Sequence, residues 1–110
     1  ADPSDRDLYA AVSEVARLEG GLAVAADGGV LASLALPIAG LMSPEPPEEV
    51  SAALRRIEDA AASLGAGLPS PFAVLSFLAL PVIPSLKLTD RGLVDVEKGA
   101  FFDFRVLAQA

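Results

Sequence analysis

The chain has 110 residues, 53% of them hydrophobic, with 15 acidic and 8 basic side chains and a net charge of −7. This length allows one domain at most, covering residues 1–110. The scarcity of Lys and Arg argues against binding to nucleic acid or to an anionic membrane, because both need clustered positive charge. The apolar share exceeds what a lone soluble domain of this size needs. We therefore expect a partner to cover part of the surface.

Three features bear on the origin of the chain. Its longest weakly polar run, residues 71–86, is shorter than the roughly 20 apolar residues of a membrane span. Its first residues lack the pattern of a secretory signal, and they begin with Ala1 in place of Met, which favours a processed or excised piece. The sequence contains no cysteine, which fits a cytoplasmic protein.

A first helix is predicted from Asp5 to Glu19. Ser4 followed by Asp7 resembles a capping box, apolar residues recur at helical spacing, and Gly20-Gly21 is expected to supply the left-handed stop. Two short apolar runs, residues 22–26 and 30–36, then flank a tight-turn sequence and predict a β-hairpin. Both faces of this hairpin are apolar, so we expect it to be covered on both sides.

A connection rich in Pro and Gly, residues 37–47, precedes the second predicted helix. Pro47 suits the first turn of a helix, apolar residues recur from Val50 to Leu64 at helical spacing, and Gly65 ends the pattern. Residues 72–80 favour a short buried helix over a buried strand.

The segment from Pro81 to Gly92 is predicted to be irregular, with strands at residues 93–96 and 101–107. Phe102, Phe104 and Val106 share one face of the second of these strands. The order of the elements predicts an α+β fold, in which a small antiparallel or mixed sheet is layered with two to three helices.

The residue types argue against catalysis by this chain alone. Metal-dependent hydrolysis usually relies on imidazole ligands, and nucleophilic catalysis by serine needs a neighbouring base. The sequence contains no His and no Cys, and its acidic residues are dispersed. We therefore assign no catalytic residue and no metal ligand.

Two connecting segments are candidate contact sites. The first places the large apolar groups Leu41 and Met42 beside Ser43, in a connection where polar residues are the norm. The second, residues 86–92, gathers polar side chains after an apolar stretch: Lys87, Thr89, Asp90 and Arg91. Either these segments pack internally, or they contact a catalytic domain and help to close its active site.

Two longer segments carry a resemblance. ALPIAGLMSPEP, residues 35–46, and LSFLALPVIPSLKLTDRGLVDV, residues 75–96, are separated by a helix and look like the C-terminal domain of bacterial adenine deaminases, which belong to the metal-dependent amidohydrolase superfamily. The chain resembles only the later part of that domain. Individual words such as LTDRG are weak, but their ordered combination is specific.

The resemblance implies a parent enzyme that hydrolyses adenine to hypoxanthine and ammonia. It implies a divalent metal, manganese, iron or zinc, held by a separate catalytic barrel that this chain lacks. The chain would then be a C-terminal fragment of a hydrolase of purine metabolism, inactive alone, with that barrel or a homo-oligomer as its partner. The alternatives are a stand-alone accessory or oligomerisation module that has lost the barrel and, less favoured because aromatic residues are few, a small-ligand module near Met42 and Arg91.

Overall fold

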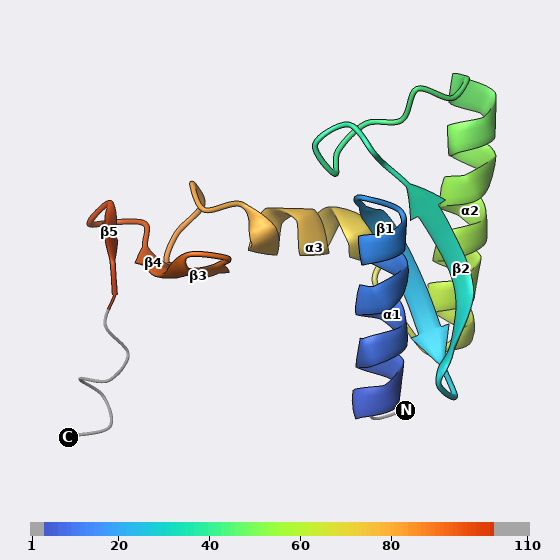
Figure 1. The fold of residues 1–110 in the computed structure, drawn as a ribbon, viewed down its shortest axis with the longest axis horizontal. Coiled ribbons are helices and arrows are strands. Elements are labelled where there is room, and N and C mark those ends of the chain that lie inside the picture. Colours follow the sequence, from blue (N-terminus) through green and yellow to red (C-terminus); the bar gives the residue numbers. More distant parts are fainter. Residues whose placement is uncertain (1–3, 103–110) are drawn as a thin grey trace. The chain divides into compact units, whose positions relative to one another are not determined.

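The computed structural model describes residues 4–102. The chain divides into two compact units, one ending at Pro71 and one beginning at Phe72, and each is described by itself. Along the described residues the elements follow the order α1-β1-β2-α2-α3-β3-β4-β5 (Figure 1). The helices accompany a two-stranded and a three-stranded antiparallel sheet. The predicted α+β class is confirmed, with the strands shared between two small sheets.

Helix α1 spans Asp5–Arg17, and the Ser4 hydroxyl caps it by accepting a hydrogen bond from the Asp7 amide at 3.1 Å. The residue that adopts the left-handed conformation after the helix is Glu19, with a φ of 59°. The Glu19 amide donates to the Ala16 carbonyl, and the Gly20 amide donates to the Val15 carbonyl. This pair of hydrogen bonds is a Schellman motif centred on Glu19.

The prediction that Gly20-Gly21 supplies the helix stop was therefore wrong. The two glycines are needed for close packing of backbone against backbone. A Cβ at Gly20 would lie 3.0 Å from the Leu36 carbonyl oxygen, and one at Gly21 would collide with the Leu34 carbonyl oxygen. Glycine removes this conflict because it has no Cβ.

Strands β1 (Gly21–Ala26) and β2 (Gly29–Ala35) form the predicted hairpin. The turn residues Asp27 and Gly28 both have positive φ values, 55° and 76°, as a two-residue type I′ turn requires. Leu22 pairs with Leu34 and Val24 pairs with Ala32, and the register shifts at a bulge between Val24 and Ala25.

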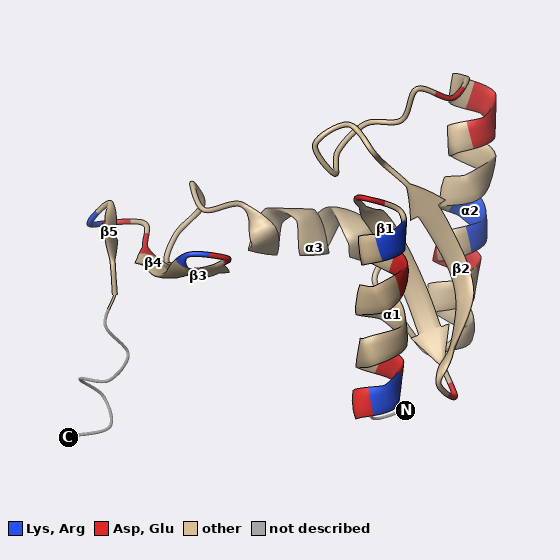
Figure 2. Cartoon of the chain, in the orientation of Figure 1, with Lys and Arg blue, Asp and Glu red and all other residues tan. Residues whose placement is uncertain are grey.

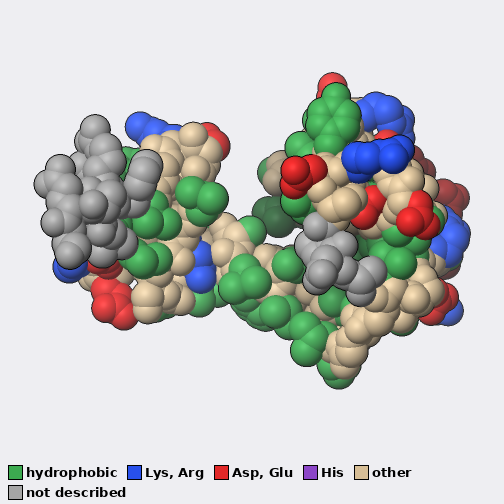
Figure 3. Space-filling view, turned by 90° about the horizontal axis from the view of Figure 1, so that it is seen from below, with side chains coloured by type: hydrophobic (Ala, Val, Ile, Leu, Met, Phe, Trp, Pro, Cys, Tyr) green, Lys and Arg blue, Asp and Glu red, His purple; other side chains and the backbone are tan. Residues whose placement is uncertain are grey.

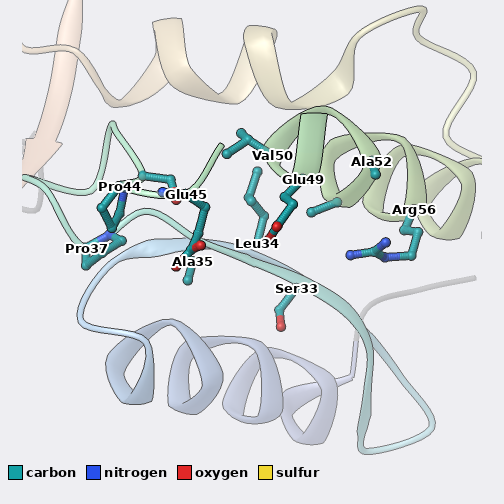
Figure 4. A pocket seen from close by; sticks show the side chains of 12 residues that line it. Ser33, Leu34, Ala35, Pro37, Pro44, Glu45, Glu49, Val50, Ala52 and Arg56 are labelled. Atoms are coloured by element: carbon teal, nitrogen blue, oxygen red, sulfur yellow. Dashed lines mark hydrogen bonds between the residues drawn. The ribbon is translucent and has the colours of Figure 1, made fainter. Parts of the chain in front are cut away.

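The hairpin is packed between two helices, α1 on one face and α2 on the other (Figures 1 and 4). Helix α2 spans Pro47–Ser63, with Pro47 in its first turn and Gly65 at a φ of 95° just after its end. The core of this unit consists of buried apolar residues from the hairpin and from α2: Val24, Leu34, Ile57 and Ala61. The predicted second helix and the expected cover on both faces of the hairpin are confirmed.

In the second unit, helix α3 spans Pro71–Ala79, which confirms a helix over a strand. The expected burial of this helix is wrong, because Phe72 is its one buried residue and the residues after it are exposed. The three-stranded sheet has the order β3-β4-β5, formed by Leu86–Thr89, Gly92–Asp95 and Ala100–Phe101.

Two further predictions for this unit need correction. The segment 81–92 was expected to be irregular, but Leu86–Thr89 pairs with β4 across a two-residue turn. Its alternation of apolar and polar residues is a strand signal that Pro81 and Pro84 obscured. Of the strand predicted at 101–107, Phe101 lies in β5, whereas Phe104 and Val106 lie outside the described residues.

Candidate functional site

The first candidate segment forms a tight reverse turn after β2. The Ile38 amide donates to the Met42 carbonyl and the Met42 amide donates to the Ile38 carbonyl, both at 3.1 Å. The residues between them, Ala39 and Gly40, have positive φ values of 57° and 71°. Ala rarely adopts this left-handed conformation. The hydrogen bonds therefore hold a locally unfavourable backbone in a defined shape.

This turn presents apolar side chains to solvent. Leu41 is 70% exposed and Met42 is 57% exposed, and Ser43 is half-buried. The Ser43 hydroxyl accepts a hydrogen bond from the Glu45 amide at 3.2 Å, so its polar contact is local. Large apolar side chains on a fixed turn, outside the core, are typical of a contact surface.

The second candidate segment is the hairpin formed by β3 and β4. The Thr89 hydroxyl donates to the Gly92 carbonyl at 2.7 Å and accepts from the Arg91 amide at 3.2 Å, so Thr89 stabilises the turn itself. Asp90 and Arg91 are exposed at that turn, and the Arg91 guanidinium lies 6.0 Å from the centre of the Phe101 ring. Lys87 is only 8% exposed, and its sequence surroundings gave no sign of this burial.

The two candidate segments belong to different compact units. Each is described within its own unit, and the expectation that they contact a catalytic domain remains a prediction.

The carboxylates whose pKa values are lowered accept hydrogen bonds that stabilise the fold. Glu14 on α1 receives hydrogen bonds from the Arg17 guanidinium and the Ser33 hydroxyl, at 2.7 and 2.8 Å, and these lower its pKa to about 2. The Gly28 amide lowers the pKa of Asp7, and the Lys98 side chain lowers that of Asp95. A carboxylate with a lowered pKa is a weak general base.

Metal binding has little support in the described residues. Between residues 4 and 102, no group of three or more Asp, Glu, His or Cys residues is arranged to hold a metal ion. Asp7, Glu14 and Asp95 already accept hydrogen bonds from neighbours within the chain. The described residues therefore offer no arrangement that fits a divalent metal. In the same range, no helix is long and apolar enough to cross a membrane.

An open groove of about 410 Å³ lies between β2, the connection that follows it and α2 (Figure 4). Ser33, Leu34 and Ala35 of β2 line one side, and Val50 and Ala53 of α2 line the other. Glu45, Glu49 and Arg56 supply charge to its lining. The sequence did not indicate this groove, because its position depends on where α2 packs against β2.

Helix α3 and the residues after it carry a second apolar surface. No charged residue occurs from Pro71 to Leu86, as Figure 2 shows for α3. The exposed large apolar residues of this unit include Val74, Leu75, Phe77, Leu78, Leu80, Val82, Leu86 and Leu88. Figure 3 shows many hydrophobic side chains at the molecular surface. Within its own unit, α3 makes no extensive contact with β3, β4 or β5. A helix that is apolar all round is normally buried.

These features define an α+β fold of two compact units with exposed apolar surfaces. Residues 2–100 match the family model of the adenine deaminase C-terminal domain, and the chain belongs to this family. The resemblance noted in the sequence is thereby confirmed.

Similar proteins include full-length adenine deaminases from three bacteria. The chain is 62% identical over 98 residues to the protein from Oleidesulfovibrio alaskensis, covering 89% of this chain and 17% of the relative. It is 56% identical over 94 residues to the Dehalococcoides mccartyi protein, covering 86% of this chain and 16% of the relative. It is 56% identical over 98 residues to the Brucella abortus protein, covering 89% of this chain and 17% of the relative. The chain thus spans only 16–17% of these relatives.

Proposed function

We propose that this chain is the C-terminal part of a cytoplasmic adenine deaminase, a hydrolase of purine metabolism that converts adenine and water into hypoxanthine and ammonia. In this proposal the chain has a structural role and helps to close the active site, and it is inactive alone. The family membership and the small share of each relative that the chain covers support the proposal.

The catalytic chemistry belongs to the rest of the polypeptide in this proposal. Hydrolysis of an aromatic amine needs an activated water, which a bound divalent metal such as manganese, iron or zinc supplies. Asp7, Glu14 and Asp95 do not fit such an ion, because their carboxylates accept hydrogen bonds or pair with cations within the chain. No step of the reaction is therefore assigned to a residue of this chain.

The observation that carries the docking role is the apolar surface of α3. Leu75, Phe77 and Leu78 are exposed on a helix without charged residues, and leaving such a surface in water costs free energy in proportion to its area. We propose that the catalytic barrel of the same enzyme covers this surface. The exposed Leu41 and Met42, with Ser43, and the segment with Lys87, Thr89, Asp90 and Arg91 are the further proposed contacts.

An assay of adenine hydrolysis tests whether the catalytic groups lie outside this chain. The purified 110-residue chain is incubated with adenine in separate samples that contain manganese, iron or zinc. Hypoxanthine is then measured by chromatography. We expect no turnover by the chain and turnover by a longer polypeptide that contains it. Hypoxanthine formed by the isolated chain at a rate proportional to its concentration would contradict the proposal.

A second candidate function is a stand-alone accessory or oligomerisation module. The same apolar surface favours it, because a second copy of the chain could cover α3 across a two-fold axis. Sedimentation equilibrium separates the candidates. A dimer that dissociates when Leu78 is changed to Asp supports the module, whereas a chain that is monomeric at high concentration supports docking on another domain.

A further inference from the structure

The groove beside α2 lies at the outer edge of β2. Successive residues of a strand point to opposite faces of the sheet, and Figure 4 shows Leu34 directed toward α2 and Ser33 directed toward α1. Yet Ser33, Leu34 and Ala35 all line this one groove. A groove that follows the outer edge of a strand borders residues of both faces in this way.

The hydrogen-bond pattern of the hairpin shows which backbone groups face this edge. The Leu36 amide donates to the Gly20 carbonyl at 2.9 Å, and the register continues through Gly21 with Ala35, Leu22 with Leu34 and Ala23 with Ser33. Hydrogen-bonded and non-hydrogen-bonded pairs alternate in an antiparallel ladder. Leu34 therefore bonds inward to β1, whereas the amides and carbonyls of Ser33 and Ala35 point outward into the groove.

The walls of the groove leave room beside these backbone groups. Helix α2 packs more extensively on β2 than on β1, so it lies toward the open edge. Where α2 borders the groove it carries the small residues Ala52 and Ala53 next to Val50. A lone two-stranded hairpin is marginal in water, and an outward row of unpaired backbone groups is a template for another strand.

We propose that an extended segment of the same polypeptide, preceding α1, pairs with the edge of β2 in antiparallel orientation and completes a three-stranded sheet. The inference rests on the proposed function, because the segment belongs to a polypeptide several times longer than this chain, as the relatives are. The backbone of the segment bonds to Ser33 and Ala35. Its side chains alternate between the α1 face and the α2 face, and those beside Val50 and Ala53 are apolar.

The path of the chain supports the segment before α1 as the origin of this strand. A strand that precedes α1 and runs parallel to β1 forms a β-α-β unit, and such connections are almost always right-handed. In Figure 1, α1 lies in front of the hairpin, β1 runs downward and β2 lies to the right of β1. A right-handed connection through α1 into β1 then begins from a strand beyond β2 on the right. That is the edge where the groove lies.

Residue-resolved amide hydrogen exchange tests the proposal. It is measured by mass spectrometry on the 110-residue chain and on the full-length Oleidesulfovibrio alaskensis enzyme, at the positions that align with Ser33, Leu34 and Ala35. We expect exchange at positions 33 and 35 to be at least about 100-fold slower in the full-length enzyme than in the chain. The amide at position 34 is the internal control, because it is bonded to β1 and is protected in both.

Three results would overturn the proposal. Fast exchange at positions 33 and 35 in both proteins would show that no strand pairs with this edge. Protection in the isolated chain that rises with its concentration would make a second copy the occupant. Fast exchange at these positions, combined with protection along α3 in the full-length enzyme, would contradict the added strand. The docking role in the proposed function would still be supported.

Discussion

At the scale of single residues, the N-terminal unit depends on side chains that bond across elements. The Asp7 amide donates to the capping Ser4 hydroxyl, and the Asp7 carboxylate accepts from the Gly28 amide at 2.7 Å, so Asp7 joins the start of the helix to the hairpin turn. Glu14 accepts from Ser33 of β2 and from Arg17, so it joins the middle of the helix to the sheet. These bonds place α1 on its face of the hairpin.

Glu14 therefore makes the stability of this unit depend on pH. Its side chain is only 13% exposed, and its pKa falls from 4.5 to about 2 on folding. A lowered folded-state pKa contributes stability that is fully present above the unfolded value and is lost as the pH falls toward 2. We expect Glu14→Gln to lower the melting temperature at pH 7, by an amount that shrinks between pH 4.5 and pH 2.

Thermal denaturation followed by circular dichroism measures this effect. The control is Asp59→Asn, which removes the same charge from the exposed side of α2. A penalty for Glu14→Gln that is equal at pH 7 and pH 2 would contradict the assigned hydrogen bonds.

Ile57 on α2 is the other residue on which this unit depends, because its side chain is 0% exposed. Truncating a buried Ile to Ala removes transfer free energy and leaves a cavity. We expect Ile57→Ala to lower the free energy of unfolding by about 2–5 kcal/mol, measured by urea denaturation. Leu54→Ala, at an exposed position one turn earlier, is expected to cost less. Equal losses in the two variants would show that Ile57 is not the centre of the core.

At the scale of elements, the hairpin and α2 illustrate what the sequence could predict. The turn at Asp27-Gly28 and the first turn of α2 at Pro47 follow from local backbone chemistry, and both were predicted. The role of Gly20-Gly21 depends on which backbone approaches those residues, and that partner, β2, lies more than ten residues along the chain. Local patterns do not contain this information.

In the candidate contact segments, too, some features follow from the local sequence and others depend on tertiary structure. An apolar turn at Leu41 and Met42 was predictable because large apolar residues are unusual between Pro and Gly, and both side chains are exposed. The burial of Lys87 and the groove at the edge of β2 were not predictable. They depend on strand pairing and on where α2 packs, and both are properties of tertiary structure.

The double glycine gives a test at this scale. A Cβ at position 21 would collide with the Leu34 carbonyl, and the residue has a φ of 145°. We expect Gly21→Ala to lower the free energy of unfolding by about 1–3 kcal/mol through backbone strain and displacement of β2. The matched control is Gly67→Ala, because a Cβ at position 67 meets no atom within 4 Å. Chemical denaturation of both variants that showed the same loss would contradict the close-packing role.

At the scale of the whole molecule, the chain is more apolar than its core requires. Its mean hydropathy is +0.51, yet the buried apolar residues in the described part are only Val24, Leu34, Ile57, Ala61 and Phe72. Exposed large apolar residues occur in both units, and those of the second unit include Leu88, which is 80% exposed. This imbalance is expected of a domain whose surface is completed by a larger protein.

Leu78 on α3 provides a test of docking. A charge placed in an apolar contact is costly unless it is paired, so we expect Leu78→Asp to weaken binding to the catalytic part of the enzyme by about 10-fold or more. Leu78→Ala, which keeps the helix, is expected to weaken binding less. Ser51→Asp adds the same charge to the exposed side of α2 and is the matched control.

The most direct test of the account is a calorimetric titration of the 110-residue chain into the Oleidesulfovibrio alaskensis adenine deaminase from which the C-terminal domain has been removed. We predict saturable binding with a negative heat-capacity change, as burial of apolar surface requires. We also predict that Leu78→Asp weakens this binding and that Ser51→Asp leaves it unchanged. Absence of binding at high concentration, or equal binding by all three chains, would contradict the claim that α3 docks this domain onto the catalytic part of an adenine deaminase.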